Sequence, residues 1–161
     1  MRYKQTSRQL FDTLYHKYLI YLYDLNIKVI KLEELDYFCY AISVTCILRY
    51  NADDHAQEMV GCLTEIMWEK YPPSFSIKLK QRYDIYQPYL DLYFNHQKTV
   101  TGLDPVIAIG ITFLNFITEE REVGHIYVVD LVMMMHKIIF SCMNKIIRDS
   151  LINSATNELY S

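Results

Sequence analysis

The sequence predicts an all-α protein, a single globular bundle of about six to seven helices around one central apolar helix. Apolar residues recur at helical spacing along nearly the whole chain. The four Gly and four Pro residues are too few for the many tight turns of an all-β sandwich. A chain of 161 residues, 52% of them hydrophobic, can form one core and is not disordered. We therefore expect one domain over residues 1–161, with a polar tail at about residues 153–161.

The charge and cysteine content exclude several classes of function. A formal net charge of −3 argues against binding to double-stranded nucleic acid, which requires a basic face. The four cysteines lie in apolar segments without a C-x-x-C pair, and the first residues lack the apolar core of a signal peptide. The longest uncharged run, residues 105–118, is too short to span a membrane. We expect a cytoplasmic protein with reduced thiols and no membrane span.

The first two helices are predicted from apolar periodicity. Ser7 can cap a first helix that ends at about Asp24, and the apolar residues of this helix cover roughly half of its circumference. A helix that faces the core on one side needs a narrower apolar stripe, so this helix is expected to have a second contact face. A second helix is predicted from about Leu32 to Tyr50.

The next two helices are bounded by acidic residues and prolines. Asp53 begins a third helix that runs to about Lys70, and the Pro72-Pro73 pair ends it. A fourth helical stretch follows at about residues 74–97. Because Pro88 lies inside this stretch, we expect a kink or two short helices there.

The fifth helix and the last long helical stretch are the most apolar. Asp104 can cap the fifth helix, with Pro105 at its favoured first position. Residues 106–117 are apolar on nearly every side, so we expect this helix to be the central one. Residues 124–151 carry only a narrow polar stripe, so a partner or the core must cover the rest. One helix and two helices divided near residues 138–143 both stay open for this stretch.

Motifs that could support catalysis have simpler structural interpretations. The Glu-x-x-His spacing at residues 122–125 is found in di-iron bundles, but no second copy exists, which favours a solvated loop. The acidic residues and histidine at 53–58 suit a helix start. Cys62 and Cys142 lie in apolar helix, which is typical of core thiols. We expect no enzyme activity, no metal and no cofactor.

Two residue types suggest a binding surface. Tyrosine supplies 15 of the aromatic residues, and many of these lie in the first two predicted helices. Methionines at 133–135 and 143 add flexible apolar surface. Either group can belong to the core, but tyrosine is also a frequent interface anchor, so both interpretations stay open.

The order of these segments resembles the poxvirus Bcl-2-like intracellular immunomodulators. The similarity lies in the Tyr-rich run 14–21, the helix end Ile-Leu-Arg-Tyr-Asn at 47–51, the segment 104–111, and the run 131–140 after a charged turn. The Asn-Trp-Gly-Arg signature of death inhibitors is missing, and the only tryptophan is Trp68. The C-terminal membrane anchor of mitochondrial members is missing as well. The chain is therefore similar to the soluble branch of that family.

This resemblance implies a non-enzymatic viral protein in the host cytosol. It would bind a host adaptor or kinase and inhibit NF-κB or interferon-regulatory signalling. It also implies a homodimer formed through the first and sixth helices, the same segments in which the sequence shows surplus apolar surface. The residues predicted at the dimer or partner interface are Tyr15, Tyr18, Tyr23, Val128 and Met135.

Two alternatives remain open at the level of sequence. In the first, a groove on the second to fifth helices captures pro-apoptotic amphipathic helices, with Tyr40, Val44, Ile47 and Ile66 as candidate groove residues. In the second, the chain is a bacterial or phage immunity or antitoxin-like protein that covers a toxin.

Overall fold

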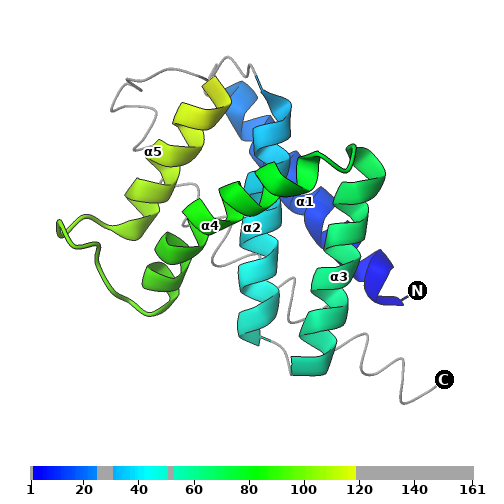
Figure 1. Ribbon diagram of the computed structural model, residues 1–161. Helices are drawn as coiled ribbons and strands as arrows, with labels where there is room; N and C mark the ends of the chain where they lie inside the picture. The colour runs from blue at the N-terminus through cyan, green and yellow to red at the C-terminus, as the bar shows by residue number, and fades with distance from the viewer. Residues whose placement is uncertain (1, 25–30, 51–52, 119–161) are drawn as a thin grey trace.

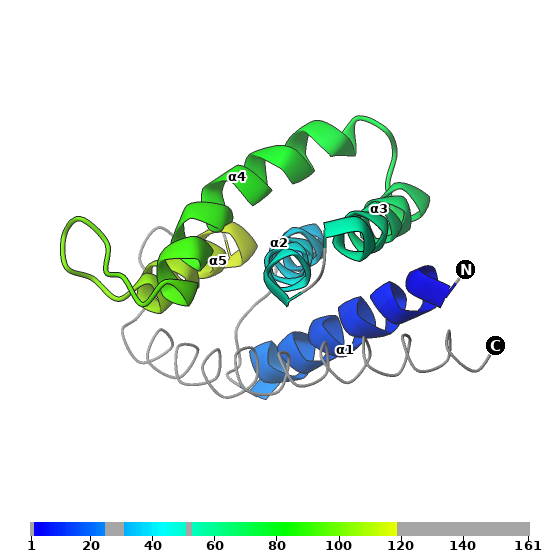
Figure 2. The same ribbon diagram turned by 90° about the horizontal axis from the view of Figure 1, so that it is seen from below.

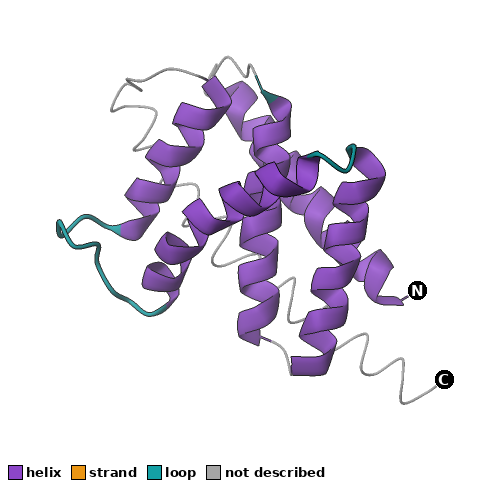
Figure 3. Ribbon diagram, in the orientation of Figure 1, coloured by secondary structure: helices purple, strands orange, loops and turns teal. Residues whose placement is uncertain are grey.

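The computed structural model describes residues 2–24, 31–50 and 53–118, and these residues fold into five α-helices with no strand among them (Figures 1 and 3). The helices are α1 (Arg2–Asp24), α2 (Leu32–Tyr50), α3 (Asp53–Lys70), α4 (Phe75–Phe94) and α5 (Pro105–Thr118). Figure 2 shows α2 and α3 side by side, with α1 on one side of them and α4 on the other. The predicted all-α class is confirmed for this part of the chain. The predicted sixth and later helices lie outside it.

Helix α1 begins earlier than the sequence predicted. Ser7 does not cap it, because the helix starts at Arg2 and Ser7 lies in its second turn. Backbone N–H groups beyond the first turn are already bonded within the helix, so a serine there has no cap to provide. The buried Ser7 hydroxyl instead donates a hydrogen bond of 3.3 Å to the carbonyl of Met59 in α3.

Helix α2, and not α5, occupies the centre of the described residues. It contacts each of the other four helices, whereas α5 packs mainly on α2 and α4. The side chains from Ala41 to Ile47 are all buried, and the Thr45 hydroxyl donates to the carbonyl of Ala41 at 2.8 Å. On α5, Ile111 is 37% exposed. The reason is that the apolar residues of α2 also cover its whole circumference, so this helix needs neighbours on every side.

Helix α4 is continuous through Pro88, so of the two predicted outcomes the division into two short helices is wrong, and the kink stays a prediction. Pro88 is exposed, while Tyr86 and Leu90 on the other side of the helix are buried. Packing of this buried side stabilises the helix despite the backbone hydrogen bond that proline cannot donate.

Helix α5 begins as predicted. The Asp104 carboxylate accepts a hydrogen bond of 2.9 Å from the backbone N–H of Val106, and Pro105 occupies the first helical position. Before it, Gly102 has a φ of 79°, a conformation that L-residues with a side chain rarely adopt.

Aromatic rings connect the helices at the core. The ring of Phe38 in α2 stacks on Phe113 of α5, with centroids 4.1 Å apart. It also meets the edges of Tyr18 of α1 and Tyr86 of α4 at 5.1 and 5.2 Å. One side chain thus joins four helices. Across the described helices, none has both the length and the apolar character required to cross a membrane.

Candidate functional site

The tyrosines predicted at an interface have different environments. Tyr18 is 1% exposed and packs against Phe38 and Phe113, so it belongs to the core in this structure and is not available to a partner. Tyr15 is half-buried, with the ammonium of Lys70 4.9 Å from its ring centre. Tyr23 is 75% exposed. Of the predicted interface residues, only Tyr23 is freely presented; Val128 and Met135 lie outside the described residues.

The predicted groove residues do not line an open groove. Val44, Ile47 and Ile66 are buried in the core. Tyr40 is half-buried, and its hydroxyl shares a hydrogen bond of 3.0 Å with Thr64 of α3. The reason is the central position of α2, since the faces that would form the groove are covered by neighbouring helices.

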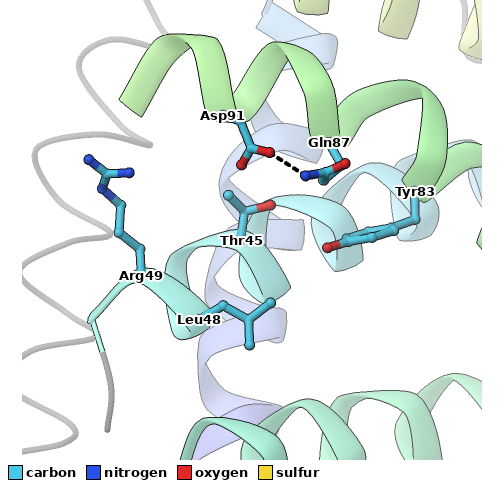
Figure 4. Close-up of a pocket in the computed structure, with 6 residues that line it drawn as sticks. All are labelled: Thr45, Leu48, Arg49, Tyr83, Gln87 and Asp91. Atoms are coloured by element: carbon cyan, nitrogen blue, oxygen red, sulfur yellow. Dashed lines mark hydrogen bonds between the residues drawn. The ribbon is translucent and has the colours of Figure 1, made fainter. Parts of the chain in front are cut away.

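A small pocket lies between the C-terminal half of α2 and α4 (Figure 4). Its volume is about 240 Å³, and it is lined by Thr45, Leu48, Arg49, Tyr83, Gln87 and Asp91. The Gln87 amide donates to the Asp91 carboxylate. The Arg49 guanidinium donates to the carbonyl of Phe94 at 2.8 Å and lies 4.9 Å from the centre of that ring. Both charged groups are therefore engaged within the protein, and the volume is below the roughly 300–1,000 Å³ of most small-molecule sites.

Two buried carboxylates at the start of α2 form ion pairs. The guanidinium of Arg82 binds both oxygens of Glu34, at 2.8 and 2.9 Å. The ammonium of Lys70 lies 2.9 Å from each oxygen of Asp36, which also accepts a hydrogen bond from the Tyr71 hydroxyl. Burial is the main cause of a raised pKa of Tyr71, and the hydrogen bond to the Asp36 carboxylate is the second cause. These fully bonded carboxylates connect α2 to α3 and α4, and their environment is that of a structural cluster.

The cysteines in the described ranges differ in burial. Burial raises the pKa of the Cys46 thiol to about 12 and that of Cys39 well above its usual value. Both are therefore protonated at neutral pH and poor nucleophiles. Cys62 is half-buried and not fully in the core as predicted. Cys142, the Glu-x-x-His residues 122–125 and the methionines at 133–135 and 143 lie outside the described residues.

The described residues contain no group of three or more His, Cys, Asp or Glu side chains that could hold a metal ion. The acidic segment at 53–58 coincides with the start of α3, as the interpretation of a helix start requires.

The outer face of α3 carries an exposed aromatic residue that is not among the predicted interface or groove residues. Trp68 is 56% exposed and borders a surface hollow of about 350 Å³, together with Tyr71, Pro73 and Ser76. Helix α1 also carries exposed apolar side chains: Ile20 and Tyr23 lie three residues apart on one helix face. Trp68 could have been found from the sequence, because it lies between Glu65 and Glu69 near the end of an amphipathic helix.

Comparison with known proteins gives no relative: no protein-family model, no curated protein and no solved structure matches the chain.

Proposed function

We propose that this chain is a non-enzymatic viral protein that binds host signalling proteins in the cytosol and thereby inhibits NF-κB or interferon-regulatory signalling. Its mode of action is occupancy: an apolar surface with aromatic anchors covers a surface of an adaptor or kinase. The family assignment behind this proposal is the resemblance to the poxvirus Bcl-2-like immunomodulators.

The observation that carries the proposal is the exposed pair on α1. Ile20 is 61% and Tyr23 75% exposed, although the same helix also places Leu14, Tyr18 and Leu22 in the core. A helix that fills the core on one side and presents large apolar groups on the other favours a second contact, either with another copy of the chain or with a partner.

The alternative, capture of pro-apoptotic helices, has less support. It requires a groove lined by Val44, Ile47 and Ile66, which are buried. A panel of pro-apoptotic helical peptides titrated into the full chain tests it, and binding below ten micromolar would favour it over the proposal.

The first prediction concerns the α1 pair. The full chain is expected to be a dimer at micromolar concentration and to suppress NF-κB or interferon-regulatory reporters in transfected cells. The double variant Ile20→Glu/Tyr23→Glu places two charges in the interface, so it should be monomeric by light scattering and at least tenfold weaker in the reporter assay.

Val100→Glu is the matched control, because Val100 is a fully exposed apolar residue in the loop between α4 and α5. It should retain both the dimer and the inhibition. A double variant that inhibits as well as the wild-type chain would contradict the role of α1. A wild-type chain without effect on either reporter would contradict the function itself.

A further inference from the structure

We draw no further inference here: the strongest candidate, the apolar hollow of about 320 Å³ that Tyr89, Leu92, Val100 and Leu103 line beside the loop between α4 and α5, carries nothing, because nothing in the described residues shows which ligand or chain would cover it.

Discussion

At the scale of single residues, the ion pairs at the start of α2 are expected to have a large effect on stability. The Glu34 carboxylate is buried, and its bidentate contact with Arg82 compensates for the loss of water. The Arg82 guanidinium lies in turn 3.8 Å from the ring centre of Phe116 on α5. The hydrogen bond to Glu34 is the main cause of a raised pKa of Arg82. This group of residues joins α2, α4 and α5.

We predict that Arg82→Met lowers the free energy of unfolding by about 3 kcal/mol, because the buried Glu34 then keeps, among the described residues, the weaker ion pair with Lys78 at 3.9 Å. The double variant Glu34→Gln/Arg82→Met should recover part of this loss, since it removes the uncompensated charge. Urea denaturation followed by circular dichroism measures both. Equal stabilities of the single and double variants would contradict the uncompensated charge of Glu34 as the cause of the loss.

At the scale of helices, local sequence determines most boundaries. The predicted limits of α2 and α3 and the start of α5 agree with the structure, because acidic first turns, proline and the Asp104 cap act within a few residues. The prediction for the start of α1 was wrong, because Ser7 is as compatible with a position inside the helix that faces α3 as with a cap. Helix α4 was expected to kink or to divide at Pro88; it does not divide, because packing of its buried side outweighs the local cost.

The two glycines at 61 and 102 provide a test at this scale. Gly61→Ala should raise the free energy of unfolding by about 0.5–1 kcal/mol, because the added methyl meets no atom and alanine favours helix. Gly102→Ala should lower it by about 1 kcal/mol, since its φ of 79° is unfavourable for alanine. Thermal and urea unfolding of the two variants would show opposite shifts; a loss of stability in Gly61→Ala would reveal a packing role for this glycine.

At the scale of the whole molecule, the central position of α2 decides which residues are accessible. Because α2 contacts every other described helix, the predicted groove residues Val44 and Ile47 are buried. The helix predicted as central, α5, packs mainly on α2 and α4 among the described helices. Apolar residues lie on all sides of both α2 and α5, so periodicity alone could not predict which of the two helices is central.

The aromatic cluster around Phe38 should stabilise this arrangement as a unit. We predict that Phe38→Ala lowers the free energy of unfolding by about 3–5 kcal/mol, because it leaves a cavity among four helices. Ile77→Ala, a control at an exposed apolar position of α4, should change it by less than about 0.5 kcal/mol. Guanidinium denaturation gives both values, and a similar small effect of Phe38→Ala would contradict a central role for α2.

The sequence by itself determined the all-α class of the described residues, both ends of α2 and of α3, the start of α5, and the presence of more apolar side chains than one helix face requires. The tertiary structure decided which of these side chains are available: Tyr18 is in the core, Tyr23 is exposed, and Trp68 lies at the edge of a surface hollow. The physical reason is that capping and periodicity act within one helix. They specify which residues share a face, whereas the choice of the face that is covered depends on contacts with helices distant in sequence.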